Sequence, residues 1–317
     1  MRAVAAPAAL KGVLSQREAA ALLAAGLRRT GLDVDEVPVA DGGEGTAQVL
    51  HAALGGTWRT AAVVDALGRP TSAEWLLLDD GTAVVESAQA IGLPQLGDEL
   101  DPWNASSRGL GELLLATLSD TPTSILVGLG GSATVDGGIG MRAVAGAWLR
   151  ELNVRVLCDV RNPLLGERGA ARVCGPQKGA DAETVELLEG RLASLDELRP
   201  YADLPGAGAA GGLGAAFASL GADLLDGAEH VLDLIEFDSR IAGAALVVTG
   251  EGTVDATTLD GKAPGAVVRR CARLGVRCEL FGGLVRDGVP AHALSGRRAL
   301  AGEDVVQLGE ELGRSAA

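Results

Sequence analysis

The chain has 317 residues and a mass of 32.0 kDa, enough for two domains of typical size, and its net charge is −15. A pI of about 4.7 disfavours a nucleic-acid-binding protein, which needs a basic surface, and 47% hydrophobic residues exclude a disordered chain. No run approaches the roughly 18 apolar residues of a transmembrane helix, and the first residues lack a signal-peptide pattern. We therefore expect a cytoplasmic protein without membrane contact.

The chain begins with a predicted β-α-β unit. RAVAAPAAL (2–10) is a short apolar strand, and SQREAAALLAAGLRRTG (15–31) is a helix with Ser15 as its N-cap, Glu18 completing a capping box and Gly31 ending it. DEVPVADGG (35–43) is a second strand that runs into a glycine turn. This order is typical of a parallel sheet.

The next segment changes in character. Three short β-rich runs, at 57–68, 71–80 and 82–88, are separated by tight turns and predict an antiparallel meander. They are followed by a helix (109–119), an apolar strand (123–131) and another helix (138–149).

After Glu151 the first pattern resumes. The predicted elements are a strand (154–160), helices (182–198 and 210–221), a strand (245–250), a helix (263–275) and a last strand (278–283). We infer an α/β protein with a discontinuous parallel domain, residues 1–43 and 151–317. A second α/β domain, with the antiparallel meander plus helices, is inserted at residues 44–150.

Glycines and carboxylates recur where the predicted strands end. These loops are Asp41–Gly45, Ser132–Gly138, Asp159 with Asn162, and Gly250–Gly252 with Asp255. In an open α/β sheet such loops form the functional edge, and glycine backbone can approach an anion closely. A single Asp-Gly pair would indicate only a turn. Four loops of the same type favour a binding site.

The lysines point to the same chemistry. Of 27 basic residues only three are Lys, and Lys11, Lys178 and Lys262 each adjoin a glycine. With 46 glycines in the chain, chance would give this arrangement about 2% of the time. Compositional bias is one explanation, and lysines in anion-binding loops are the other. Lysines, carboxylates and glycine loops together are what Mg²⁺-dependent phosphoryl transfer requires.

Other familiar sites do not fit. Gly261-Lys262 is followed by Ala263, which excludes a P-loop, and the flanks of Ser132 do not form a GxSxG turn. The GxGxxG spacing within 206–211 does not follow a strand, so we expect it to serve packing. The four cysteines form no CxxC pair, which argues against zinc and redox sites. The three histidines lie outside all these loops.

Several ordered motifs resemble those of bacterial class I glycerate kinases. The match runs along most of residues 3–285, in VADGGEGT (39–46), DPWNASSRGLGELL (101–114), VGLGGSATVDGGIGM (127–141), CDVRNPLLG (158–166), CGPQKGA (174–180), PGAGAAGGLGAA (205–216) and VVTGEGTVDATTLDGKAPGAV (247–267). The resemblance implies a flavodoxin-like α/β domain with a second α/β domain inserted. It also implies transfer of the ATP γ-phosphate to a hydroxyl of D-glycerate in the interdomain cleft.

The resemblance carries functional roles onto specific residues. Lys11, Asp136, Asp159 and Asp255 would be catalytic, and Asp159 and Glu251 would hold Mg²⁺. Substrate and phosphates would be bound by Asp41, Gly42, Gly43, Glu44, Gly130, Gly131, Ser132, Thr134, Asn162, Gln177, Lys178, Gly250 and Lys262. The small-molecule substrate would be D-glycerate or a related hydroxy acid, with no nucleic-acid partner, and a homodimer is left open.

The motifs also depart from the family pattern. Ala8 and Ala9 stand where the family has polar residues beside the lysine. The family also has other residue types in place of Val135, Arg161 and Thr253. An alternative is therefore a catalytically impaired or substrate-shifted homologue that binds a ligand or partner without turnover. The sequence leaves open whether the product is 2- or 3-phosphoglycerate and which nucleotide is preferred.

Overall fold

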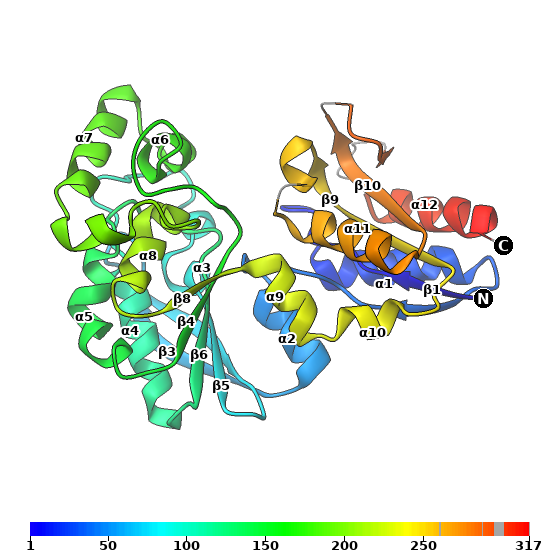
Figure 1. Ribbon diagram of the computed structural model, residues 1–317, viewed down its shortest axis with the longest axis horizontal. Coiled ribbons are helices and arrows are strands. Elements are labelled where there is room, and N and C mark those ends of the chain that lie inside the picture. Colours follow the sequence, from blue (N-terminus) through cyan, green and yellow to red (C-terminus); the bar gives the residue numbers. More distant parts are fainter. Residues whose placement is uncertain (260, 287, 295–300, 317) are drawn as a thin grey trace. The chain divides into compact units, whose positions relative to one another are not determined.

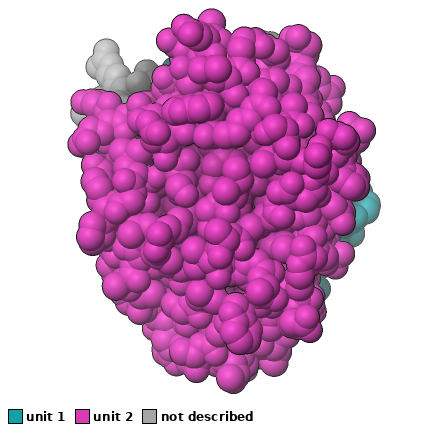
Figure 2. Space-filling view, turned by 90° about the vertical axis from the view of Figure 1, so that its left-hand side faces the viewer, with its two compact units in different colours: residues 1–41, 48–50, 228–317 teal, residues 42–47, 51–227 magenta. Residues whose placement is uncertain are grey.

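The computed structural model describes residues 1–259, 261–286, 288–294 and 301–316. The chain forms two compact units, each with its own sheet and core. Residues 1–41, 48–50 and 228–317 make the first, and residues 42–47 and 51–227 make the second (Figure 2). No helix in the described part of the chain has the length and apolarity needed to cross a membrane.

The first unit contains a parallel sheet in the order β11-β10-β9-β1-β2 (Figure 1). Numbered along the chain, this is the order 2-1-3-4-5 of flavodoxin-like folds, as the resemblance implied. Its strands are β1 (Arg2–Ala5), β2 (Asp33–Glu36), β9 (Leu246–Val254), β10 (Cys278–Val285) and β11 (His292–Ala293). Its helices are α1 (Gln16–Arg28), α9 (Gly227–Leu234), α10 (Phe237–Ile241), α11 (Ala263–Leu274) and α12 (Ala301–Ala316), with a 3-10 turn η5 (Ala256–Leu259).

Helices cover both faces of this sheet. Leu23 and Leu27 of α1 and Leu308 of α12 pack with Ala3 and Leu246 of the central strands in one apolar cluster. Val4 and Val247 point to the opposite face, because side chains alternate along a strand. Helix α11 lies on that side, with Val267 and Cys271 buried. Burial on both faces explains why these strands are continuously apolar.

The start of α1 follows the predicted cap. Ser15 accepts a hydrogen bond from the backbone N–H of Glu18, whose carboxylate accepts one from the Ser15 N–H at 2.9 Å. This reciprocal pair satisfies two N–H groups that have no partner inside the helix. The loop that carries Lys11 therefore ends at a helix start that these hydrogen bonds hold in place.

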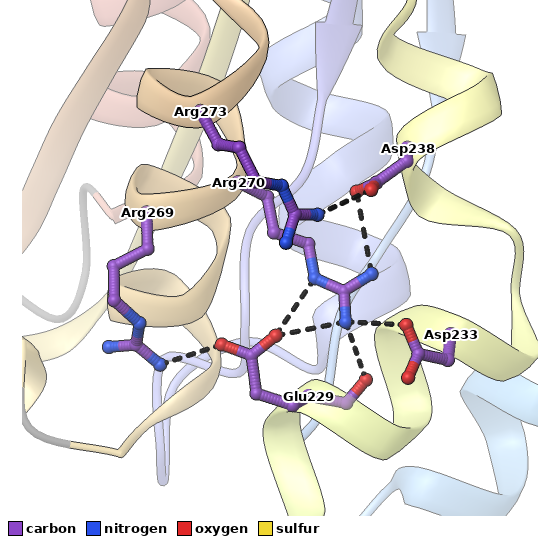
Figure 3. A network of polar contacts seen from close by, with 6 residues as sticks. All are labelled: Glu229, Asp233, Asp238, Arg269, Arg270 and Arg273. Carbon is purple, nitrogen blue, oxygen red and sulfur yellow. Dashed lines mark hydrogen bonds and ion pairs between the residues drawn. The ribbon is translucent and has the colours of Figure 1, made fainter.

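An arginine network joins α9, α10 and α11 (Figure 3). The Arg270 side chain, only 6% exposed, donates to Glu229 at 2.9 Å, to Asp233 at 2.6 Å and to Asp238 at 3.4 Å. Arg269 and Arg273 contact the outer oxygens of Glu229 and Asp238. A single planar guanidinium thus holds the two short helices against α11.

The second unit contains a mixed sheet in the order β3-β4-β5-β6-β7-β8. The first three strands form the predicted antiparallel meander, and β5 to β8 are parallel. The strands are β3 (Thr57–Val64), β4 (Pro70–Leu77), β5 (Thr82–Glu86), β6 (Ser124–Gly128), β7 (Val154–Cys158) and β8 (Asp223–Asp226).

Four α-helices of the second unit, at 108–117, 139–149, 182–193 and 209–218, correspond to predicted helices, whereas the helices at 46–54, 87–91 and 170–174 were not predicted. The helices of this unit are α2 (Thr46–Leu54), α3 (Ser87–Ile91), α4 (Arg108–Thr117), α5 (Ile139–Leu149), α6 (Ala170–Cys174), α7 (Ala182–Ala193) and α8 (Ala209–Ala218). Short 3-10 helices are η1 (Leu93–Leu96), η2 (Leu118–Asp120), η3 (Pro176–Lys178) and η4 (Asp196–Tyr201). The predicted helix 182–198 is shorter, since α7 ends at Ala193. The predicted helix 210–221 is not helical at its start, because residues 210–212 have positive φ.

The second unit is larger than the insertion predicted at residues 44–150. Residues Ile125–Gly128 of β6 pair in parallel with Val154–Leu157 of β7, and β7 pairs with β8. Residues 151–227 therefore extend the second sheet instead of returning to the first. An apolar strand such as VRVLCDV fits the interior of either parallel sheet, so its pattern does not determine which sheet it joins.

Candidate active site

The predicted site residues fall into two groups, one in each unit. Lys11, Asp41, Gly250, Glu251, Asp255 and Lys262 belong to the first unit, and the remaining predicted residues belong to the second. In each unit some of these residues follow the carboxyl ends of parallel strands, where functional loops of such sheets lie: Lys11 follows β1, residues 130–134 follow β6, and Asp159 follows β7.

Glu251 lies at the centre of the first group. Its side chain, 12% exposed, accepts a hydrogen bond from Thr258 Oγ1 at 2.6 Å and pairs with Lys262 Nζ at 3.3 Å. Burial raises the pKa of Glu251, and the charge of Asp41 adds to that effect, while Thr258 and Lys262 oppose it. Thr258 was not among the predicted residues, because a threonine in a polar loop has no distinctive sequence signal.

Asp255 is held in a short turn beside this pair. Its carboxylate accepts from the Thr257 N–H at 2.9 Å and from Thr257 Oγ1 at 2.5 Å. The hydroxyl of Thr257 lowers the pKa of Asp255, so this group is ionised at neutral pH. Thr258 Oγ1 also accepts from the Asp255 N–H at 3.0 Å, which links Asp255 to Glu251 through one hydroxyl.

Glu251 and Lys262 line a pocket of about 300 Å³ within the first unit. Its polar lining is Lys11, Glu251, Thr253, Lys262 and Asp304, and its other lining residues are Leu10, Val13, Gly252, Gly283, Leu284, Leu294 and Ala301. Thr253, one of the departures from the family pattern, thus lines the pocket. Predicted site residues on three separate segments of the chain meet around one cavity.

Glycines and a tight turn shape this pocket. A Cβ on Gly283 would approach the Gly252 carbonyl oxygen to 2.7 Å, so the ends of β9 and β10 can lie this close only without side chains. Lys11 stands on the turn between Leu10 and Leu14, whose backbones are paired, and Gly12 adopts φ +73° there. The exposed Lys11 is thus presented by a short, closed loop.

In the second unit the Gly42–Gly43 turn packs closely on neighbouring strands. Gly42 has φ +91°, and a Cβ there would lie 2.6 Å from Leu157 Cβ. A Cβ on Gly130 would lie 2.4 Å from Gly43 Cα. Thr46 Oγ1 accepts from the Gly42 N–H at 3.1 Å and donates to the Gly43 carbonyl at 2.7 Å. Close approach therefore requires glycine at these predicted positions.

The same turn depends on a residue that the sequence did not single out. Glu86, 2% exposed at the end of β5, accepts from the Ala47 N–H at 2.6 Å and from the Gly45 N–H at 3.2 Å. It satisfies backbone donors at the start of α2, beside the exposed Glu44. Burial raises the pKa of Glu86, against the two backbone hydrogen bonds. Glu86 ends an apolar strand, and its partners lie about forty positions away.

Lys178 is buried next to the glycine loop that follows β6. Its side chain is 3% exposed and donates to Ser132 Oγ at 3.1 Å and to the Thr134 carbonyl at 2.8 Å. Burial lowers the pKa of Lys178, while the charges of nearby Asp136 and Asp159 act in the opposite direction. Gln177, next in the chain, is exposed. The structure thus brings three of the predicted site residues, Ser132, Thr134 and Lys178, together.

Asp136 has a different environment from the one expected of a catalytic carboxylate. It is 5% exposed and accepts from Ser107 Oγ at 2.7 Å, from the Ser107 N–H at 2.8 Å and from the Gly138 N–H at 3.0 Å. The Gly140 N–H donates to it at 3.2 Å. Its oxygens therefore anchor the starts of α4 and α5, and this observed role is structural.

Asp159 and Asn162 follow β7. Asn162 Nδ2 donates to the Arg168 carbonyl at 2.8 Å, which closes the loop between them, and Asp159 Oδ2 lies 3.5 Å from where a Cβ on Gly130 would stand. In the described ranges, no three His, Cys, Asp or Glu side chains are grouped in a way that could hold a metal ion. Mg²⁺ in phosphoryl transfer needs only one or two carboxylates besides phosphate oxygens and water. A single carboxylate such as that of Asp159 therefore fits its requirements.

The glycine-rich segment at 205–216 supports these loops. A Cβ on Gly211 would lie 2.0 Å from the Thr134 carbonyl, and one on Gly208 would lie 2.3 Å from the Pro163 carbonyl. The Gly137 N–H donates to the Gly211 carbonyl at 3.0 Å. The segment thus packs beneath two site loops, in keeping with the packing role expected for its GxGxxG spacing.

Comparison with known proteins gives one consistent result. The model of the glycerate kinase family matches residues 3–150 and 143–303. Glycerate 2-kinase of Escherichia coli is 40% identical over 305 residues, covering 83% of this chain and 80% of that protein. Glycerate kinase of Bacillus subtilis is 37% identical over 310 residues, covering 85% and 81%. The crystal structure of a proposed glycerate kinase 2 from Salmonella typhimurium LT2 superposes with a TM-score of 0.82 at 33% identity, covering 99% of this chain and 98% of that one.

Proposed function

Because the chain belongs to the glycerate kinase family, we propose that it transfers the γ-phosphate of ATP to a hydroxyl of D-glycerate with the help of Mg²⁺. The observation that carries the proposal is the first unit's pocket, in which two lysines and a partly buried carboxylate meet beside the carboxyl ends of β1 and β9. Phosphoryl transfer depends mainly on positioning and on neutralising phosphate charge, which such a set supports.

The lysines would neutralise the phosphates. Lys262 is held by Glu251 before substrate arrives, and its remaining donors can turn to a phosphate oxygen. Lys178 is buried, and in the second unit it adds positive charge beside the glycine loop at 130–134. Lys11 would contact the carboxylate of glycerate or the transferred phosphoryl group.

In each unit one carboxylate is proposed to serve Mg²⁺, Glu251 in the first and Asp159 in the second. When bound, the ion would neutralise charge on the phosphate oxygens. The Glu251 carboxylate is fixed by Thr258, so it would present its oxygens in a defined direction.

Asp255 is the better candidate for orienting the reacting hydroxyl. It is ionised, and its turn is linked through Thr258 to Glu251. The oxygens of Asp136 already accept four hydrogen bonds, which leaves it a positioning role for the loop after β6.

The test is a coupled ADP-release assay with D-glycerate, ATP and Mg²⁺, followed by phosphorus NMR to identify which hydroxyl is phosphorylated. Lys262→Ala in the first unit and Asp159→Ala in the second should each lower kcat/KM by about 10²–10³, because each removes a charge that acts on the transferred group. Melting temperature should change little.

Arg17→Ala is the matched control, because Arg17 is an exposed base on α1 outside both groups. It should keep wild-type turnover. Release of ADP no faster than without glycerate, with ATP still raising the melting temperature, would reject the kinase proposal in favour of a binding homologue. Wild-type turnover in either alanine variant would show that its assigned role is wrong.

A further inference from the structure

The pocket of the first unit has a lining that phosphate chemistry leaves unexplained. Beside Lys11, Lys262 and Glu251 it contains Leu10, Val13, Leu284 and Leu294. Leu284 is 49% exposed although it lies on β10, next to a buried strand segment. An aliphatic side chain left open in a pocket indicates that the ligand has an apolar part.

D-glycerate does not match this lining. Each of its three carbons carries oxygen, and burying hydroxyls against leucine side chains would leave them without hydrogen-bond partners. A nucleotide combines a flat base with apolar faces and a chain of phosphates. One such molecule would contact the aliphatic lining residues through its base and the lysines through its phosphates.

The position of the pocket in the fold points the same way. Strand β1 leads to β2 on one side of the sheet, and β9 leads to β10 on the other, so β1 and β9 flank the point where the strand order reverses. Ligands of open α/β sheets bind outside the carboxyl ends of the strands at this point. Lys11 follows β1, and Glu251 and Thr253 lie in the last part of β9.

We propose that this pocket holds the adenosine part of ATP against Leu284 and the neighbouring aliphatic side chains, with Lys11 and Lys262 facing the phosphates. The inference rests on the proposed function for the identity of the donor as ATP. It adds that the first unit, by itself, selects the nucleotide. The hydroxy acid would then be recognised by residues other than this aliphatic lining.

The test separates base recognition from phosphate recognition. Leu284→Asn removes the apolar contact without adding charge, and inorganic tripolyphosphate is a probe that has the phosphates but no base. Titration calorimetry with Mg²⁺ and without glycerate should show ATP binding about tenfold weaker in this variant. Tripolyphosphate binding should be unchanged, whereas Lys262→Ala should weaken both ligands.

Leu274→Asn is the matched control, since Leu274 is 44% exposed at the end of α11 and does not line the pocket. It should bind ATP as the wild type does. The inference is overturned if Leu284→Asn leaves ATP affinity unchanged, weakens tripolyphosphate equally, or raises only the KM for D-glycerate. Absence of ATP binding by the wild type would overturn it as well. ATP binding with the expected pattern but without turnover would reject the proposed function alone.

Discussion

Single residues of the site differ in what their surroundings allow them to do. Glu251 lines the pocket and is joined to Asp255 through Thr258, whereas the carboxylate of Asp136 accepts hydrogen bonds from four donors at the starts of two helices. Sequence alone placed Asp136 and Asp255 in equivalent loops. Their environments differ because Asp136 accepts hydrogen bonds from Ser107, which lies 29 positions away along the chain. No local sequence pattern encodes such a contact.

Glu86 offers a residue-level prediction with a defined pH dependence. Its pKa is raised above the ordinary 4.5 by burial, so the folded protein binds this proton more tightly than the unfolded chain does. The stability that Glu86 contributes is therefore fully present below pH 4.5 and falls as pH rises through its folded-state pKa. Glu86→Gln cannot titrate, so the stability advantage of the wild type over this variant should shrink as pH rises.

Urea unfolding between pH 4 and pH 8 would measure this difference. A wild-type advantage over Glu86→Gln that grows with pH would contradict the assignment.

At the scale of elements, the loops could be predicted from the sequence more easily than the strands and side chains that pack against them. The capping box at Ser15 and Glu18 is local, so its pattern determines its structure. The glycines of the site loops were also found, but the reason for them lies in strands distant in the chain, such as Leu157 against Gly42. The boundary of the second unit was misplaced for the same reason, because strand partners are not encoded in the strand's own apolar pattern.

Gly42→Ala tests the close approach of the turn. The left-handed φ of Gly42 and the 2.6 Å distance to Leu157 Cβ both oppose a side chain. We expect the substitution to destabilise the protein by about 2–4 kcal/mol and to reduce turnover, because the loop must shift. Thermal unfolding and the ADP-release assay would measure the two effects.

Gly31→Ala provides the comparison, since Gly31 has φ +85° but no heavy atom within 4 Å of its would-be Cβ. This substitution should lower the free energy of unfolding by only about 1 kcal/mol, the strain of a side chain on left-handed backbone. Equal destabilisation by the two substitutions would show that contact with Leu157 contributes nothing.

At the scale of the whole molecule, each unit has its own core, and the first is built from both ends of the chain. The flavodoxin-like order and the meander could be predicted, because they follow from family motifs and from turn spacing. The network around Arg270 could not, since arginines on a polar helix do not reveal their partners. It anchors the two helices that come directly after the chain leaves the second unit.

Arg270→Met tests whether that network stabilises the first unit. We expect a loss of about 2–4 kcal/mol, because three carboxylates lose a buried partner but can be rehydrated. Arg270→Lys should recover little, since an ammonium cannot donate in the plane of a guanidinium. Denaturant unfolding followed by hydrogen exchange of α11 would measure the change; unaltered protection of α11 in the methionine variant would contradict the prediction.

The split construction of the first unit has a consequence for how the chain is made. Strand β1 leaves the ribosome long before β9, which pairs along its other edge and follows only after more than two hundred further residues. At about 5–20 residues per second, this is a wait of roughly 10–50 s. The whole second unit is synthesised in that interval and can fold while the edge of β1 stays unpaired. The last quarter of the chain therefore completes the fold, and an exposed strand edge must be protected from aggregation until it arrives.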